Sequence, residues 1–238
     1  MHAWAARCFI LLLAGGTLGC ASLSTVQTAD TLGKKNFQIA VEAGVQRSPS
    51  PSLPYYPHFD AAFRLGVTEA IDVGVRVGYS GLELQGKFLL TRPGDPRLAM
   101  SLAPALSGGL LPGAASTLVM MNVAVPLLIG LKQDNGNEFV FGPRLQGRFM
   151  ASPSQAAALE LGLSAGYSIR IGKKFGILPE LAASLPLVQS AGASALLGTP
   201  SPFAENAMSF GNHFMLQFKV GFAFGSQRRQ DTSIVTVR

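Results

Sequence analysis

The chain has 238 residues, enough for one large domain, and only 13% of them are charged while 48% are hydrophobic. An ordinary soluble domain carries about 25% charged residues, so this composition argues against a fully solvated surface. The bases behind the formal charge of +6 are scattered along the chain, which argues against a nucleic-acid partner. Both cysteines, Cys8 and Cys20, precede residue 21, so the rest of the chain has no thiol for a disulfide, a zinc site or a nucleophile.

The start of the chain has the order of a secretory signal: Arg7, then the apolar run 8–13, then small residues. The apolar run is too short to span a bilayer as a helix. The sequence Thr17-Leu18-Gly19-Cys20 resembles the lipobox of bacterial lipoproteins, in which the cysteine receives a lipid and cleavage precedes it. Thr17 departs from the leucine that such motifs usually carry, and ordinary signal cleavage near Ala21 is the alternative interpretation.

The lipobox resemblance implies a signal peptide over residues 1–19 and a lipidated Cys20. Residue 21 is alanine rather than the aspartate of an inner-membrane retention signal, which by the same resemblance favours sorting to the outer membrane. The stretch that follows is short and polar. We therefore expect residues 20–35 to form a lipidated tether.

The rest of the sequence alternates between apolar and polar residues with a period of two, as β-strands between two different environments do. In residues 36–46, for example, Ile39 and Val41 share one face while Glu42 lies on the other. No run after residue 13 holds eighteen consecutive apolar residues, so no transmembrane helix is expected. The pattern predicts strands at 36–46, 58–67, 69–79, 82–90, 97–107, 117–132, 138–150, 157–171, 174–189 and 208–225.

The predicted connections alternate between short and long, which is the habit of bacterial outer-membrane barrels. Alternation alone does not say which face meets lipid, because a soluble barrel alternates too, with its apolar face inward. Here the polar faces are rich in Gly, Ala and Ser, and the apolar faces are too bulky for the interior of a small barrel. Aromatic residues also recur near strand ends. These features predict an apolar exterior.

The chain thus resembles the small bacterial outer-membrane β-barrel proteins as a class, over residues 36–225. The predicted fold is all-β: an antiparallel up-and-down transmembrane β-barrel of about ten strands, followed by a polar tail at 226–238. Members of the class often end on an aromatic residue of the last strand, and the tail departs from this habit. The resemblance implies the outer membrane of a Gram-negative cell, with membrane lipid around the barrel. An even number of strands puts both ends of the chain at the same rim, and the tether puts that rim, with the N-terminus, on the periplasmic side. The resemblance also implies a structural, narrow-lumen transport or scaffold role. The alternative is a soluble, lipid-anchored periplasmic barrel that binds a hydrophobic ligand.

If the apolar faces point outward, six acidic and seven basic side chains point into the lumen. Buried charges need partners, so we expect a network of ion pairs that fills the barrel, with a narrow polar conduit as the alternative. The predicted lumen residues are Glu42, Asp60, Arg64, Asp72, Arg76, Glu83, Lys87, Arg144, Arg148, Glu160, Arg170, Glu180 and Lys219.

The sequence gives no indication of an enzyme, a cofactor or a metal site. Only His58 and His213 remain after export, and His213 with Ser209 is the one pair worth considering for nucleophilic catalysis, although no recognised motif surrounds it. The loops 47–57 and 190–207 could contact an envelope protein, but surface loops without a partner are the simpler interpretation.

Overall fold

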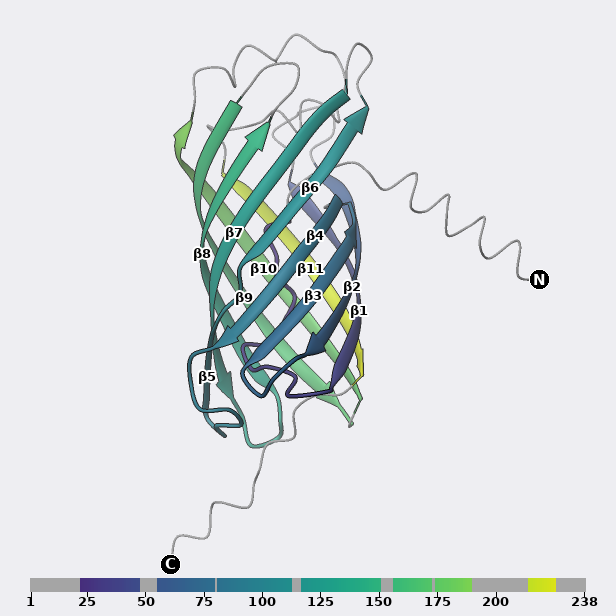
Figure 1. Cartoon of the computed structure of the whole chain (residues 1–238), viewed down its shortest axis with the longest axis vertical. Coiled ribbons are helices and arrows are strands. Elements are labelled where there is room, and N and C mark those ends of the chain that lie inside the picture. The colour runs from purple at the N-terminus through teal and green to yellow at the C-terminus, as the bar shows by residue number, and fades with distance from the viewer. Residues whose placement is uncertain are drawn as a thin grey trace, which may run out of the picture.

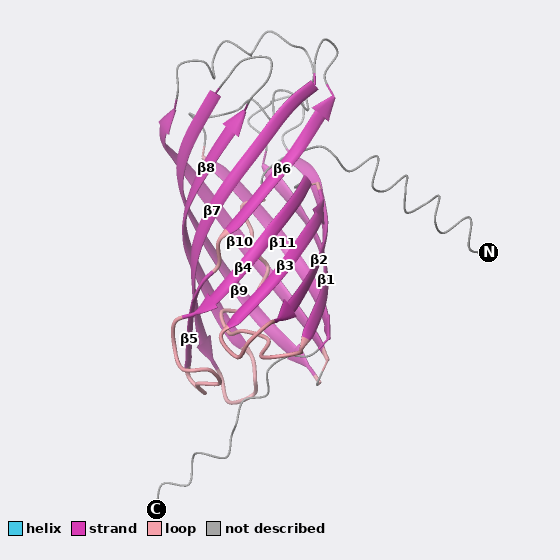
Figure 2. Cartoon of the chain, viewed as in Figure 1, coloured by secondary structure: helices cyan, strands magenta, loops and turns pink. Residues whose placement is uncertain are grey.

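The computed structural model describes residues 22–47, 55–79, 81–112, 117–150, 156–172, 174–189 and 214–225. Most of these residues form antiparallel strands that pair in sequence order, apart from β5 and β6, and β1 pairs with β11 to close the sheet into a barrel (Figure 1). Figure 2 shows strands and loops and no helix among the described residues. The predicted all-β, up-and-down barrel is therefore confirmed. The strands are β1 (Phe37–Arg47), β2 (Tyr55–Gly66), β3 (Ile71–Gly78), β4 (Gly81–Leu89), β5 (Leu98–Leu102), β6 (Ala105–Pro112), β7 (Thr117–Lys132), β8 (Glu138–Met150), β9 (Ala156–Ile171), β10 (Phe175–Gln189) and β11 (Met215–Gly225).

Two of these strands share one position in the barrel, so the barrel has ten strand positions. β5 and β6 both pair with β4 on one side and with β7 on the other, and they are separated only by Ala103 and Pro104. Proline has no backbone N–H to donate to the sheet, which accounts for the interruption. The carbonyl of Pro104 still accepts a hydrogen bond from the amide of Gly86 at 2.9 Å.

Three predicted boundaries need correction. The strand predicted to end at residue 107 continues to Pro112, because residues 108–112 pair with β7 although their sequence does not alternate. The loop predicted at 47–57 is shorter, because β2 already begins at Tyr55. The last strand begins at Met215 rather than at residue 208, and residues 208–213 lie outside the described part of the chain.

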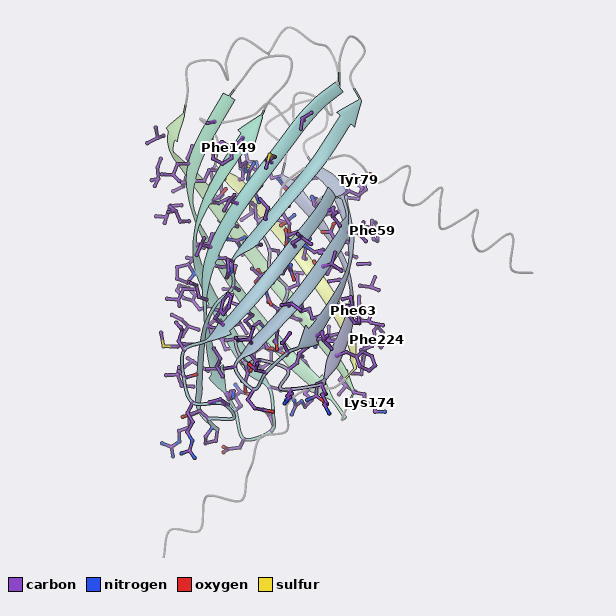
Figure 3. The ribbon with its side chains drawn as sticks, viewed as in Figure 1. Phe59, Phe63, Tyr79, Phe149, Lys174 and Phe224 are labelled. Carbon is purple, nitrogen blue, oxygen red and sulfur yellow. The ribbon has the colours of Figure 1, made fainter. Side chains whose placement is uncertain are left out.

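The exterior of the barrel is apolar. In β1 the burial alternates residue by residue, with Val41 46% exposed and its neighbour Glu42 fully buried. The same outward apolar face continues around the barrel, for example at Leu84 on β4 and Leu161 on β9. Figure 3 shows Phe59, Phe63 and Phe224 on the outer face of the barrel. An apolar exterior around a polar interior is the arrangement of a transmembrane barrel, and it is the reverse of a barrel that holds a hydrophobic ligand.

Aromatic pairs lie toward the rim at which β1 begins. The rings of Phe37 and Phe63 stack with centroids 6.5 Å apart, and those of Phe175 and Phe224 lie 5.0 Å apart. Such pairs suit the boundary between lipid tails and headgroups, where aromatic girdles of barrels are found.

The expected tether does not extend away from the barrel. Residues 22–33 lie inside the lumen, where all but the partly exposed Thr28 are buried, and the chain then reverses into β1 (Figure 1). This corrects the prediction for residues 22–33 of the 20–35 tether. Cys20 itself lies outside the described residues. The physical reason is that the polar lumen wall needs hydrogen-bond partners, and this segment supplies them.

The reversal from the lumen into β1 is held by the β2–β3 turn. Gly33 and Lys35 adopt positive φ angles of 81° and 65°, which a tight turn requires. The amide of Lys35 donates to the carbonyl of Gly66 at 2.9 Å, and the amide of Gly66 donates to the carbonyl of Asn36 at 2.8 Å. A Cβ atom at Gly66 would lie 1.9 Å from the carbonyl oxygen of Gly33, so the turn depends on glycine there.

Within the described ranges, no helix has the length and apolar character needed to span a membrane.

An outward-facing charge should distinguish a lipid-facing exterior from a solvated one. Val41 lies next to the central residue of β1 and faces outward, so we expect Val41→Arg to lower the free energy of unfolding in lipid vesicles by about 2–4 kcal/mol, as arginine does on the lipid face near the bilayer midplane. The matched control is Val41→Ile, which keeps the face apolar. A loss within about 0.5 kcal/mol for the arginine variant, as for ordinary surface substitutions, would contradict a lipid-facing position.

Candidate functional site

Residues 22–32, named here the lumen segment, form the centre of the site. Their backbone amides donate to acidic and amide side chains of the wall in an order that follows the barrel axis. At the rim where β1 begins, the amide of Leu32 donates to both carboxylate oxygens of Asp72, at 3.1 and 3.0 Å. The amide of Ala29 donates to the side chain of Glu138, the first residue of β8, at 2.8 Å. Residues 29–32, the lower half of the lumen segment, are therefore fixed to β3 and β8.

The upper half of the lumen segment is held by β10 and β11. The amides of Thr25 and Val26 donate to the two carboxylate oxygens of Glu180, at 3.0 and 2.7 Å. Closer to the opposite rim, the amides of Leu23 and Ser24 both donate to Oε1 of Gln217, at 2.8 and 2.9 Å.

Basic residues of the wall bind the carbonyl oxygens of the same segment. Arg76 donates to the carbonyl of Ser24 at 3.0 Å, and Arg64 donates to the carbonyls of Thr25 and Val26 at 3.3 and 3.2 Å. Further down, the ammonium of Lys87 donates to the carbonyls of Thr28 and Asp30 at 2.9 and 3.1 Å. An extended buried segment leaves its own amides and carbonyls without strand partners, and the charged wall satisfies both kinds of group.

Apolar side chains of the lumen segment pack on apolar or small residues of the wall. Leu23 packs with Ala182 and Met215, and Ala29 packs in a second cluster with Ala99, Ala103, Leu128 and Val140. Glycine makes room for the segment between these clusters. A Cβ atom at Gly221 would lie 2.0 Å from Cγ1 of Val26, so only glycine fits there without displacing the segment.

Val26 adopts a φ angle of 41°, which is unfavourable for a β-branched residue. Its amide is bound by Glu180 and its carbonyl by Arg64, so contacts on both sides hold the backbone in this conformation. Strain of this kind persists only where the surroundings over-determine the backbone. These contacts therefore hold this part of the lumen segment in one conformation.

A cluster of ion pairs lies beside the upper half of the segment. Its members are Glu42, Asp60, Arg64, Arg76, Glu83 and Lys219, named here the Glu42 cluster. Glu42 is fully buried and lies within 3.7 Å of Arg64, 3.3 Å of Arg76 and 3.2 Å of Lys219. Arg76 also pairs with Glu83 at 2.7 Å, and Lys219 also pairs with Asp60 and donates to Oγ of Ser22 at 3.0 Å. The cluster therefore joins β1, β2, β3, β4 and β11 to the lumen segment.

The wall formed by β8 and β9 is less well satisfied. Arg148 pairs with Glu160 at 3.1 Å, and Glu160 accepts a hydrogen bond from Ser184 at 3.1 Å. Among the described residues, Nε and Nη2 of buried Arg144 and both amide atoms of buried Gln146 have no hydrogen-bond partner. Arg144 lies along Gly162, where a Cβ atom would be 2.8 Å from its Cγ.

Twelve of the thirteen predicted lumen residues are buried, and the exception is Arg170, which is half-buried near the rim where β1 begins. Three charged residues that contact the lumen segment or belong to it are absent from the predicted set: Asp30, Lys132 and Glu138. Glu138 is in phase with Arg144 and Arg148 on β8, so the alternation already identified could have found it. Lys132 is the last residue of β7, and its ammonium lies 2.5 Å from the carboxylate of Asp30 in the lumen segment.

One further contact lies at the rim where β1 begins. Lys132 donates to the backbone carbonyl of Asp95 at 2.7 Å, in the β4–β5 connection. Hydrogen bonds from the amides of Leu98 and Arg97 lower the pKa of the exposed Asp95 carboxyl, which keeps this turn residue ionised.

Two cavities lined by described residues beside the lumen segment are small. One of about 40 Å³ is lined by residues such as Asp30, Glu138 and Arg170, and another of about 20 Å³ lies beside Val26 and Gly221. A single water needs roughly 10–15 Å³ of such space, so these cavities have room for a few waters and not for a solute. Within the part of the chain that the structure covers, no group of three or more His, Cys, Asp or Glu side chains could hold a metal ion.

The remaining predicted features fall in different places. His58 lies fully buried in the lumen, with Nδ1 3.5 Å from Asp60 and its ring 5.7 Å from that of Tyr79. His213, Ser209 and the whole loop 190–207 lie outside the described residues, as do residues 48–54 of the other loop.

No family model and no curated protein matches this chain. Among solved structures it is similar to Ail, the attachment invasion locus protein of Yersinia pestis, at 8% identity and a TM-score of 0.34, over 81% of this chain and 99% of that one. It is also similar to CarO of Acinetobacter baumannii, at 14% identity and a TM-score of 0.24, over 78% of this chain and 96% of that one. At such scores neither match carries functional information, and the transmembrane character of the barrel follows from its own exterior.

Two arginines on opposite walls should respond differently to the loss of charge. Arg76→Met leaves Glu83 without an ion-pair partner among the described residues and removes one of the three basic partners of Glu42, so we expect it to lower the free energy of unfolding by about 3–5 kcal/mol. Arg144→Met removes a buried charge that forms no ion pair with a described residue, so we expect it to be neutral or stabilising. Denaturant unfolding in lipid vesicles measures both. Equal losses for the two variants would show that the Glu42 cluster is not specially dependent on Arg76.

Proposed function

We propose that the protein is an outer-membrane β-barrel lipoprotein whose lumen is sealed by its own N-terminal segment, with a structural or scaffold role and no enzymatic activity. One observation carries the proposal: the lumen segment contacts the wall from Asp72 near one rim to Gln217 near the other. Transport through the lumen requires this segment to move aside.

The sealing is supported by the number and kind of contacts. Acidic side chains bind amides of the segment and basic side chains bind its carbonyls, so a displaced segment leaves buried charges without partners on both sides. Breaking such pairs is strongly unfavourable in a low-dielectric interior. The barrel is therefore suited to remain closed at rest.

The outer membrane is supported by the closed barrel and its apolar exterior, since in a bilayer every backbone polar group must be satisfied internally. The longest connection, 190–214, joins β10 to β11 at the rim opposite to the start of β1. Longer loops of outer-membrane barrels face the cell exterior, so we place the start of β1 and the end of β11 on the periplasmic side. Membrane lipid surrounds the barrel, and Cys20 is the proposed lipidation site.

A non-enzymatic role is supported by the surroundings of His58. Its ring lies buried beside Asp60 and Tyr79, where a substrate would have to displace the lumen segment or the Glu42 cluster. A hydrophobic-ligand carrier is disfavoured, because the lumen is charged and filled while the apolar faces point outward.

Single-channel recording in planar bilayers tests the seal. We expect the full-length barrel to be silent, and a variant that lacks residues 22–32 to conduct, because water and ions then occupy the space of the segment. A milder variant, Glu180→Ala with Gln217→Ala, removes four amide contacts and should give intermittent openings. Heat-modifiable migration in SDS verifies that each variant is folded. Steady conductance by the unmodified protein at the level of the deletion variant would overturn the sealed-barrel proposal.

Membrane fractionation tests the lipoprotein part of the proposal. We expect the wild-type protein to stay in outer-membrane fractions through carbonate washing, to shift mobility on boiling and to incorporate labelled palmitate. Cys20→Ala should lose the label and still insert, because the barrel holds itself in the bilayer. A Cys20→Ala protein that is soluble and folded in the periplasm would instead mean that the lipid is the only membrane anchor.

A further inference from the structure

We infer that the chain upstream of Ser22 leaves the barrel at the rim of the long 190–214 connection, so that the exported N-terminus passes through its own barrel to the cell surface. The membrane sidedness in this inference rests on the proposed function. The path through the barrel rests on the contacts of the lumen segment alone.

The direction of the segment is fixed by the order of its contacts. Leu32 is bound by Asp72, the second residue of β3, at the rim where β1 begins. Ser22 lies beside Gln217, with Oγ and Oε1 3.3 Å apart. Gln217 pairs with Gln46, one residue before the end of β1. Followed from Leu32 back to Ser22, the chain therefore runs from the rim where β1 begins to the rim where β1 ends.

The length of the segment agrees with a full crossing. Ten peptide units separate residues 22 and 32, and an extended chain advances by at most about 3.3–3.6 Å per residue. The reach of roughly 35 Å exceeds the apolar band of about 25 Å that outer-membrane barrels present.

A return to the periplasmic rim would need a second pass through the same lumen. The lumen at this level holds the Glu42 cluster, and Ser22 is already bound to Lys219 of that cluster at 3.0 Å. The two cavities lined by described residues beside residues 26–32, of about 40 and 20 Å³, are too small for another strand of chain. The segment therefore continues outward from Ser22.

The consequence for Cys20 follows from its distance along the chain. Two residues reach at most about 7 Å, so a lipid on Cys20 belongs to the leaflet at the long-loop rim, the outer leaflet of the outer membrane. The expectation of a periplasmic N-terminus thus holds for the start of the barrel and not for the start of the exported chain.

Epitope tags on the full chain test the sidedness. One tag is inserted between Ala21 and Ser22, and a matched tag follows Arg238. We expect antibody binding to the first tag on intact cells to equal that on permeabilised cells, and binding to the second to appear only after permeabilisation. An N-terminal tag that is reached only after permeabilisation, on a barrel that still shifts on boiling, overturns the inference and leaves the proposed barrel standing. Loss of the heat shift in the untagged wild type would instead contradict the proposed function.

Engineered disulfides test the path without a tag, in a Cys20→Ala background that leaves no other cysteine in the exported chain. Leu23→Cys with Ala182→Cys, and Ala29→Cys with Ala99→Cys, join residues that pack together near opposite rims, so both pairs should cross-link. The swapped pairs, Leu23→Cys with Ala99→Cys and Ala29→Cys with Ala182→Cys, should not cross-link. Efficient cross-linking of the swapped pairs, or of none of the four, overturns the path.

Discussion

The structure depends on hydrogen bonds between the buried charged side chains of the barrel wall and the buried backbone of the lumen segment. A ten-position barrel lies close to the size at which side chains alone fill the lumen, but its wall here also carries many small inward residues. An extended segment supplies one amide and one carbonyl per residue, and the wall meets them with carboxylates such as Glu180 and with bases such as Arg64. Neither partner is stable alone in that environment, because an unpaired buried ion or amide costs several kcal/mol. The barrel and its N-terminal segment are therefore one folding unit.

Strand positions and the orientation of their faces follow from the sequence because the period of two is a local property. Val41 and Glu42 alternate in the sequence and face lipid and lumen in the structure. The break at Pro104 could not be placed, because a strand that pauses for two residues and resumes has no distinctive local pattern. The lumen segment was missed for a related reason. Thr25, Gln27 and Thr28 suit a polar lumen as well as water, and the wall partners of Thr25 and Thr28 lie from 39 to 155 positions away in the sequence. Pairing across such separations is set by the closure of the barrel and not by neighbouring residues.

The two sides of the lumen are unequal, and the inequality follows from the position of the segment. On the side of β1, β2, β3 and β11, the Glu42 cluster is densely paired and also binds Ser22 and Ser24. On the side of β8, Nε and Nη2 of Arg144 and the side-chain amide of Gln146 have no described hydrogen-bond partner. The segment therefore rigidifies one wall more than the other. An opening along β8 and β9 would leave the Glu42 cluster intact, and the ion pair that links these two strands is Arg148–Glu160.

The same contacts constrain how the barrel can form. The lumen segment precedes β1, yet its partners include Glu180 on β10 and Gln217 and Lys219 on β11, the strand that closes the barrel against β1. A segment bound at both rims cannot be threaded easily into a finished barrel. Val26 lies so close to Gly221 that a Cβ atom there would be 2.0 Å from its Cγ1, and Ala29 packs with Leu128 and Val140. The simpler order is that β10 and β11 close over a segment already lying along the first strands. Closure of the sheet and sealing of the lumen are then the same step, which explains why residues near both ends of the barrel sequence carry the contacts that hold it shut.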